Sequence, residues 1–384
     1  MDGDIAIHNK HAEKRRIIAA VLLLTLLIAC VNLFFVNKYD QAAYGYNGSS
    51  SIVMEVSTKR VLYGKNINQR LPMASTTKIM TGLAVLENSK LDEVVTIPRK
   101  AVGVEGSSIY LKEGEKLTVK ELLYGLMLRS GNDAATALAI HTGKSLEGFV
   151  KMMNDKALSL GLKNTHFTNP HGLHNQNHFT SAYDLAYISA TAMQNPVFAE
   201  IVGTKFITIG GMDGNRYLYN KNKLLKSYPG ATGVKTGFTK KAGRCLVASS
   251  KRNGMEVIAV TLNCGPMFEE CSRLMDKAHS EFEMANIAKS GQTLAEIQVL
   301  KGKKDKARLC VKEDIYVPVK KGGSEKLEYK LKISDSVKAP VKKDRYVGEM
   351  EVYLEDCLLF SKKIYTIEDV EKKGAIDYLK DFFR

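Results

Sequence analysis

A serine and a lysine stand three residues apart in the stretch MASTTKIMT, residues 73–81, and that spacing can do chemistry. If Ser75 begins a helix, three residues are nearly one turn, so Lys78 Nζ returns to the face that carries Ser75 Oγ. A buried lysine near other cations loses proton affinity, and a neutral amine can accept the proton of a serine nucleophile. Ser75 and Lys78 are therefore a candidate nucleophile and base, although this spacing alone is common.

A second element is the tripeptide Ser130-Gly131-Asn132, which falls in the break between two expected helices. A serine in such a loop can pass a proton from the base to a leaving nitrogen. The side-chain amide of Asn132 can bind a substrate carbonyl. Ser130 and Asn132 could thus supply the proton relay and the substrate contact that attack by a serine nucleophile requires.

A third element is Lys235-Thr236-Gly237, expected on a strand and followed by Phe238. The lysine charge and the threonine hydroxyl suit a substrate carboxylate, and the glycine lets an extended peptide approach the strand. The N–H of Phe238 could complete an oxyanion hole with the N–H of Ser75 at the start of its helix. This element is the expected substrate-binding edge.

The three motifs together, in this order, resemble the active-site set of the penicillin-recognising serine enzymes. The flanking segments LPMASTTKIMT, LMLRSGNDAA, HFTSAYDLA and GVKTGFTKKAG are similar to those of the low-molecular-mass D-alanyl-D-alanine carboxypeptidases, and the likeness covers about residues 51–369. The resemblance implies an α+β catalytic domain of the β-lactamase/DD-peptidase type, with an antiparallel sheet and a helical subdomain. A small all-β sandwich is expected to follow it.

The resemblance also implies a reaction, namely removal of the terminal D-alanine from peptidoglycan stem pentapeptides through an acyl-enzyme, with β-lactams as acylating inhibitors. Ser75 would be the nucleophile, Lys78 the proton acceptor and Ser130 the proton shuttle. The substrate would be bound by Asn132, Lys235, Thr236, Gly237 and Phe238. No metal or organic cofactor is required by this mechanism.

Two residues near the third motif add to this expectation. The best-known members of the family have histidine after the Lys-Thr-Gly triplet, whereas this chain has Phe238, which leaves open how the deacylating water is held. Lys221, not far before the Lys235 strand, is a further candidate for gripping the terminal carboxylate of the substrate.

Two other functions share the motifs. A class A β-lactamase adds a glutamate that activates the deacylating water, but residues 148–199 contain no glutamate, only Asp155 and Asp184, and Asp184 is assigned to helix capping. A non-catalytic β-lactam or peptidoglycan sensor would need a geometric defect behind intact motifs. Both are kept as minor alternatives.

Four histidines, at positions 166, 171, 174 and 178, invite a zinc interpretation. They lack the His-Glu-x-x-His pattern, and Pro170 and Gly172 break any helix that would align them. The preferred interpretation is a polar loop on the active-site side, with no metal.

The formal net charge is +15, yet the chain has no zinc-finger spacing and no RNP-like aromatic motif, so nucleic-acid binding is disfavoured. A basic face toward an anionic envelope explains the charge as well.

The length of 384 residues predicts two folded units plus a targeting segment.

The N-terminus predicts export to the cell membrane. Residues 1–16, which carry Lys10, Lys14, Arg15 and Arg16, are expected to be a cytoplasmic tail, and the apolar run 17–36 a transmembrane anchor or, less favoured, a cleaved signal. Lipidation at Cys30 is a minor alternative. Residues 37–50 are expected to form a linker, so the catalytic domain, 51–290, would lie on the extracytoplasmic side.

The cysteines after Cys30 are odd in number and without a CxxC pair, and most are interpreted as small buried hydrophobes.

The catalytic domain is expected to have strands around a helical middle. Strands are predicted at 52–56, 60–63, 243–250 and 255–262, the last two joined by the hairpin signal Asn253-Gly254. Helices are predicted from Ser75, from the capping box at Thr118 through about Leu128, over 133–141, and after Ser181.

Residues 291–369 have the alternating pattern of a β-sandwich, with strands at 296–300, 315–319, 327–333, 346–354 and 358–365. Residues 370–384 can form a short amphipathic helix. Docking of that helix on the sandwich is favoured over contact with a membrane.

Overall fold

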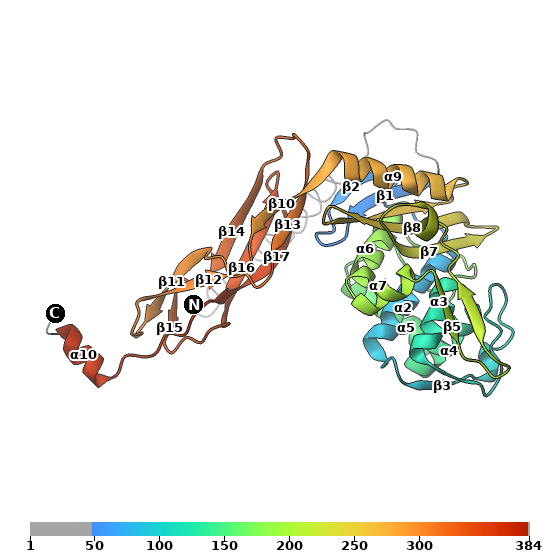
Figure 1. Cartoon of the computed structure of the whole chain (residues 1–384), viewed down its shortest axis with the longest axis horizontal. Coiled ribbons are helices and arrows are strands. Elements are labelled where there is room, and N and C mark those ends of the chain that lie inside the picture. Colours follow the sequence, from blue (N-terminus) through green and yellow to red (C-terminus); the bar gives the residue numbers. More distant parts are fainter. Residues whose placement is uncertain (1–47, 383–384) are drawn as a thin grey trace, which may run out of the picture.

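The computed structural model describes residues 48–382, which form a catalytic domain and an all-β domain side by side along the long axis of the molecule (Figure 1). The catalytic domain is built on a five-stranded antiparallel sheet in the order β2-β1-β9-β8-β7. Its strands are β1 (Ser50–Glu55), β2 (Val61–Lys65), β7 (Ala231–Thr239), β8 (Gly243–Arg252) and β9 (Met255–Leu262). The predicted strands are confirmed.

The hairpin predicted at Asn253-Gly254 joins β8 to β9. Both turn residues have positive φ, 49° for Asn253 and 80° for Gly254. A two-residue turn of this kind matches the twist of the flanking strands. The register of β8 on β9 follows from it, with Arg252 opposite Met255.

Helices cover both faces of this sheet. On one face lies α9 (Met267–Glu281), and on the other lies a helical subdomain (Figure 1). The helices of the subdomain are α2 (Lys78–Asn88), α3 (Val119–Leu128), α4 (Asn132–Gly143), α5 (Leu146–Ser159), α6 (Ala182–Met193) and α7 (Pro196–Gly203). The α+β prediction is confirmed.

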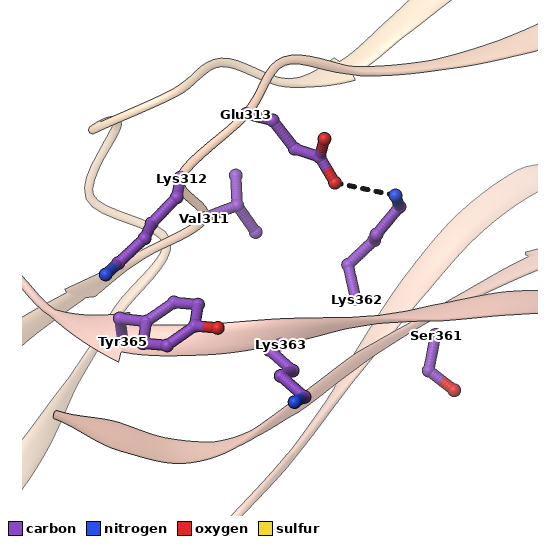
Figure 2. A pocket seen from close by; sticks show the side chains of 7 residues that line it. All are labelled: Val311, Lys312, Glu313, Ser361, Lys362, Lys363 and Tyr365. Atoms are coloured by element: carbon purple, nitrogen blue, oxygen red, sulfur yellow. Dashed lines mark hydrogen bonds and ion pairs between the residues drawn. The ribbon is translucent and has the colours of Figure 1, made fainter. Parts of the chain in front are cut away.

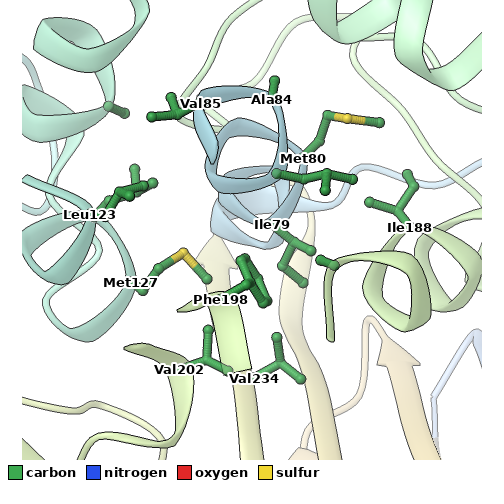
Figure 3. Close-up of a cluster of buried hydrophobic side chains, with 14 of the residues drawn as sticks. Ile79, Met80, Ala84, Val85, Leu123, Met127, Ile188, Phe198, Val202 and Val234 are labelled. Carbon is green, nitrogen blue, oxygen red and sulfur yellow. The ribbon is translucent and has the colours of Figure 1, made fainter. Parts of the chain in front are cut away.

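The first turns of α2 are buried on all sides, from Lys78 through Val85. Figure 3 shows Ile79 and Met80 of α2 among apolar side chains from neighbouring elements, with Phe198 of α7 and Val234 of β7 on one side. Burying a side chain of this size contributes roughly 1.5–3 kcal/mol. The start of α2 is therefore held firmly in the core.

Two predicted helix caps are present. At α3, Thr118 Oγ1 accepts from Glu121 N and Glu121 Oε2 accepts from Thr118 N at 2.8 Å, which is a complete capping box. At α6, Ser181 Oγ accepts from Asp184 N. The carboxylate of Asp184 also accepts from Asn164 N and Thr165 Oγ1, both at 2.8 Å, so this residue holds a neighbouring loop as well as the helix start.

Shorter elements complete the catalytic domain. They are the 3₁₀ helices η1 (Ala74–Thr77) and η2 (Arg99–Ala101), the hairpins β3 (Val94–Thr96) with β4 (Lys116–Thr118) and β5 (Phe206–Ile209) with β6 (Arg216–Tyr219), and α8 (Leu224–Ser227). The helix expected from Ser75 thus starts as a 3₁₀ turn and becomes α-helical at Lys78.

The all-β domain has two sheets around one core. The small sheet pairs β10 (Phe282–Ala288) with β13 (Ile315–Lys320). The large sheet has the order β14-β16-β17-β12-β11-β15 and comprises β11 (Ala295–Leu300), β12 (Lys306–Cys310), β14 (Leu327–Ile333), β15 (Ser336–Lys338), β16 (Tyr346–Leu354) and β17 (Cys357–Thr366). Val317 of the small sheet and Met350 of the large one are buried in the same core.

The five strands predicted after residue 290 are confirmed, whereas β10, β12 and β15 were not predicted. Because β10 pairs with β13, the fold of the second domain includes residues before 290. The cysteines at 245, 264, 271 and 310 are buried and form no disulfide, as their interpretation as small hydrophobes predicts.

A pocket of about 390 Å³ lies on the all-β domain, lined by Val311, Lys312, Glu313, Ser361, Lys362, Lys363 and Tyr365 (Figure 2). Lys362 Nζ is paired with Glu313 Oε1 at 2.6 Å. None of the predicted site residues lines this pocket.

The C-terminal helix α10 (Ala375–Phe382) projects from the end of the all-β domain (Figure 1). Ile376 is 69% exposed and Tyr378 is 47% exposed. The prediction that this helix docks on the sandwich is therefore wrong, because its apolar side chains at these positions are not covered.

Within residues 48–382, no helix combines the length and the hydropathy that a membrane crossing requires. The predicted tail and membrane segment, residues 1–36, lie outside the described residues, as do residues 37–47 of the linker.

Candidate active site

Ser75 lies in η1, directly before the buried start of α2. The turn is held by its own threonines, since Thr76 Oγ1 donates to Met73 O at 2.6 Å and Thr77 Oγ1 donates to Ala74 O at 2.8 Å. Lys78 Nζ lies 3.2 Å from Ser75 Oγ. The spacing of three residues therefore brings the two side chains together, as predicted.

Lys78 is fully buried, and its ammonium nitrogen has two further acceptors. Nζ donates to Asn132 Oδ1 at 2.7 Å and to the backbone oxygen of His171 at 2.6 Å. Burial lowers the pKa of Lys78 well below its ordinary value, and the charges of Lys235 and Lys221 lower it further. A lysine in this environment can exist as a neutral amine and accept a proton.

Ser130 and Asn132 reach the same place from the start of α4. Asn132 bonds Lys78 directly, and its Nδ2 donates to Glu105 O. Ser130 has a positive φ of 63° and is buried, yet its Oγ has no hydrogen-bond partner among the described residues. A buried hydroxyl without a partner costs free energy, so its presence points to a ligand that would pair with it.

The Lys-Thr-Gly motif lies on β7, which is an edge strand of the five-stranded sheet within the described chain. Lys235 is buried and its Nζ donates to Thr236 O at 3.0 Å. A Cβ on Gly237 would lie 3.1 Å from Ser75 N and from Met73 O. The glycine therefore lets β7 itself approach the turn that carries Ser75. Its role in admitting a substrate stays a prediction.

Phe238 is 63% exposed at the end of this motif. Its side chain therefore faces solvent. Its role in an oxyanion hole with the N–H of Ser75 stays a prediction.

Lys221, the additional candidate, is also brought to the site. Its Nζ donates to Ser107 Oγ at 2.9 Å, and Ser107 O accepts from Asn132 N at 2.7 Å. Its charge lowers the pKa of both Lys78 and Lys235. Lys78, Lys235 and Lys221 therefore form a cluster of three lysines, which suits an anionic ligand.

The pKa of Lys235 predicts how activity depends on pH. Burial lowers the pKa of this lysine to about 7, and Lys221 adds to the shift. If the protonated form binds the terminal carboxylate of the substrate, kcat/KM should fall as pH rises above 7, whereas protonation of Lys78 should reduce it at low pH. The measurement is kcat/KM for a pentapeptide between pH 5 and pH 10.

The matched variant for this prediction is Lys235→Arg, whose guanidinium stays protonated. Its alkaline fall should move beyond the measured range even if KM rises. A peptide with an amidated C-terminus should lack the alkaline fall in the native protein. An unchanged alkaline fall in Lys235→Arg would assign it to another group.

The loop that carries His171 was predicted as polar and close to the active site, and this is confirmed by the bond from Lys78 to His171 O. Its fit depends on Gly172, with φ 92°, where a Cβ would lie 1.9 Å from Ala74 O. The backbone of this loop thus packs directly under the turn that presents Ser75.

We expect Gly172→Ala to destabilise the protein by about 2–4 kcal/mol, because it combines a backbone clash with a left-handed φ. Urea unfolding measures this change. The control is Gly103→Ala, which has φ 71° but no atom within 4 Å of the added Cβ. Equal losses for the two variants would mean that φ strain alone, and not the contact under Ser75, explains the effect.

The histidines of this loop serve hydrogen bonds. His178 Nε2 lies 2.8 Å from Thr77 Oγ1, and its Nδ1 accepts from Thr168 N at 3.0 Å. Burial lowers the pKa of His171 to about 4 and that of His178 to about 3. In the part of the chain that the structure describes, no three histidine, cysteine or acidic side chains are grouped as metal ligands.

Comparisons with known proteins agree with this geometry. Residues 38–265 match the family model described as D-alanyl-D-alanine carboxypeptidase, and residues 282–372 match the C-terminal domain of penicillin-binding protein 5. The chain is 37% identical to the D-alanyl-D-alanine carboxypeptidase DacF of Bacillus subtilis, over 94% of this chain and 97% of that protein. It is 30% identical to DacA of Escherichia coli, over 88% of each chain.

Solved structures are similar to this chain over both of its domains. Penicillin-binding protein 5 of Haemophilus influenzae is 29% identical, with a TM-score of 0.70 over 86% of this chain and 99% of that one. A peptidoglycan synthesis regulatory factor, PBP3, of Streptococcus pneumoniae is 27% identical, with a TM-score of 0.74 over 85% of this chain and 100% of that one. The chain therefore belongs to the D-alanyl-D-alanine carboxypeptidase family, with a penicillin-binding protein 5 C-terminal domain behind its catalytic domain.

Proposed function

We propose that this D-alanyl-D-alanine carboxypeptidase removes the terminal D-alanine from peptidoglycan stem pentapeptides through an ester on Ser75. Ser75 Oγ attacks the carbonyl carbon of the penultimate D-alanine while its proton passes to Lys78. The amide C–N bond then breaks, and Ser130 relays a proton to the leaving D-alanine nitrogen. Water hydrolyses the ester, which releases the shortened peptide and restores Ser75.

The observation that carries this proposal is the setting of Lys78. Its nitrogen is buried 3.2 Å from Ser75 Oγ and is surrounded by acceptors, with its pKa lowered by burial and by two other lysines. A lysine in this state can act as a general base near neutral pH. The remaining groups fit a peptide that ends in a carboxylate, because Lys235 and Lys221 supply positive charge and Asn132 supplies an amide.

β-Lactams would acylate the same serine. The β-lactam carbonyl takes the place of the D-alanine carbonyl, and opening of the ring leaves a penicilloyl ester on Ser75. Because the leaving nitrogen stays attached to the adduct, it hinders the approach of water, and the ester is expected to be long-lived.

The test is mass spectrometry of the purified protein, incubated with penicillin and separately with a pentapeptide that ends in D-Ala-D-Ala. The expected result is a long-lived penicilloyl adduct, mapped to the peptide that contains Ser75, together with loss of one alanine from the pentapeptide. Rapid penicillin hydrolysis without peptide cleavage would mean a β-lactamase. An adduct without cleavage of any peptide would mean a sensor. If no adduct forms and no peptide is cleaved, both enzyme functions are contradicted.

The proposal includes a location. Lysines and arginines before the apolar run 17–36 support a membrane anchor that leaves the catalytic domain on the extracytoplasmic side, where peptidoglycan is found. Deleting residues 1–36 should release penicillin-binding activity from the membrane fraction. Activity that stays with the membrane after this deletion would place the anchor elsewhere.

A further inference from the structure

The hairpin β5–β6 has an aromatic outer face. Ile209 and Leu218 point into the core of the helical subdomain, as expected for a sheet with one buried side. On the opposite side, the exposed residues are Phe206, Thr208, Tyr217 and Tyr219. An exposed face is normally polar, so three neighbouring aromatic rings in this position point to an interaction.

The three rings form a continuous surface. Phe206 is directly opposite Tyr219 in the register of the hairpin, and their ring centroids are 4.6 Å apart. The ring of Phe206 is nearly parallel to that of Tyr217, at an interplanar angle of 6° and a centroid distance of 6.4 Å. Such an arrangement offers flat aromatic faces and the two tyrosine hydroxyls together.

The hairpin is fastened so that this surface keeps its orientation. Arg216 of β6 makes two bonds to the buried carboxylate of Glu115, with Nη2 2.9 Å from Oε2. Arg216 Nε also donates to Ile109 O at 2.8 Å, and Met212 N in the hairpin turn donates to Glu115 Oε1 at 2.9 Å. Buried bidentate pairs of this kind are rigid.

The strand that carries the aromatic surface continues along the chain into the active site. Tyr219 is followed by Asn220 and Lys221, and Lys221 N donates to Leu128 O at 3.1 Å. Lys221 Nζ then bonds Ser107, whose backbone oxygen accepts from Asn132 N. Asn132 bonds Lys78, so a few covalent and hydrogen bonds connect the surface to the catalytic lysine.

We propose that Phe206, Tyr217 and Tyr219 form a stacking surface for the N-acetylated sugar rings of the glycan that carries the stem peptide. This inference rests on the proposed function, because a stem peptide held at Ser75 brings its glycan to the edge of the site. Sugar rings present C–H faces that pack on aromatic rings, and their hydroxyls lie at the ring edges. The tyrosine hydroxyls and Thr208 supply hydrogen-bond partners for those edges.

Binding can be tested with a single fluorophore, because the chain contains no tryptophan. In Tyr217→Trp, a β-1,4-linked tetramer of N-acetylglucosamine should shift the tryptophan emission with a saturable dependence on sugar concentration. The control is Tyr329→Trp on β14 of the all-β domain, which should not respond. A response to phosphatidylglycerol vesicles and none to the sugar would overturn the proposal in favour of a membrane surface, and no response to either would also overturn it.

Catalysis gives the second test. In the triple variant Phe206→Thr, Tyr217→Thr and Tyr219→Thr, threonine keeps strand propensity. We expect kcat/KM for a pentapeptide attached to its disaccharide to fall about tenfold, with cleavage of the free pentapeptide and acylation by penicillin retained. Equal losses for both substrates, or none for either, would contradict a sugar site. If the native protein cleaves neither substrate, the proposed function fails, while the tryptophan titration still decides whether the surface binds sugar.

Discussion

Replacing Ser75 with alanine is expected to reduce pentapeptide cleavage about 10⁴-fold or more and to abolish the covalent penicillin adduct. The hydroxyl is the only group that can form the proposed ester, and loss of a nucleophile removes the whole covalent route. The measurements are alanine release and intact-protein mass spectrometry after incubation with penicillin.

The fold should not change in this variant, because within residues 48–382 the hydrogen bond of Ser75 Oγ is the one with Lys78 Nζ, at 3.2 Å. Its thermal midpoint should stay within a few degrees of the native value. Ser280→Ala, on the exposed end of α9, is a matched control that should keep full activity. An adduct that persists in Ser75→Ala would place the nucleophile at another residue.

Replacing Lys78 with methionine is expected to reduce the rate of acylation by penicillin about 10²- to 10⁴-fold, the usual contribution of a general base. Methionine fills the same buried space without an amine, so Ser75 would remain in place but would keep its proton. Time-resolved mass spectrometry of adduct formation measures the rate.

Two variants separate this effect from a loss of structure. Lys78→Arg keeps a positive charge but stays protonated, so it should be as slow as Lys78→Met. Lys156→Met, on α5, removes a lysine whose Nζ pairs with Glu87 Oε1 and should keep the native rate. Native activity in Lys78→Arg would mean that Lys78 contributes charge and not proton transfer. The two acceptors left unpaired in Lys78→Met, Asn132 Oδ1 and His171 O, should cost about 1–3 kcal/mol each in unfolding free energy.

The sequence alone predicted those parts of the site that lie in short motifs. Ser75 and Lys78 are close because one helical turn separates them, and the capping box at Thr118 is a local pattern with a local result. The hairpin at Asn253 has the same character, since two residues with positive φ decide the turn. Local chemistry of this kind is readable without tertiary structure.

Local sequence patterns could not predict the contacts between distant segments. The bond from Lys78 to His171 O and the packing of Gly172 under Ala74 join residues roughly a hundred positions apart, and no local pattern marks them. The hairpin β5–β6 also went unpredicted, because its aromatic outer face hides the alternation that identifies a half-buried strand. The prediction that α10 docks on the all-β domain was wrong, because an amphipathic pattern indicates an apolar face without saying what covers it.

The place of β1 in the sheet has a consequence for the order of folding. This first strand lies between β2 and β9, and Ile52 is paired with Val260. Its pairing on both sides can be completed only after the chain has been made as far as residue 262, because such distant pairing must wait for its partner. Until β9 has been made, one edge of β1 stays unpaired, so the sheet that positions the Ser75 turn against β7 is complete only after residues 231–262 have joined it.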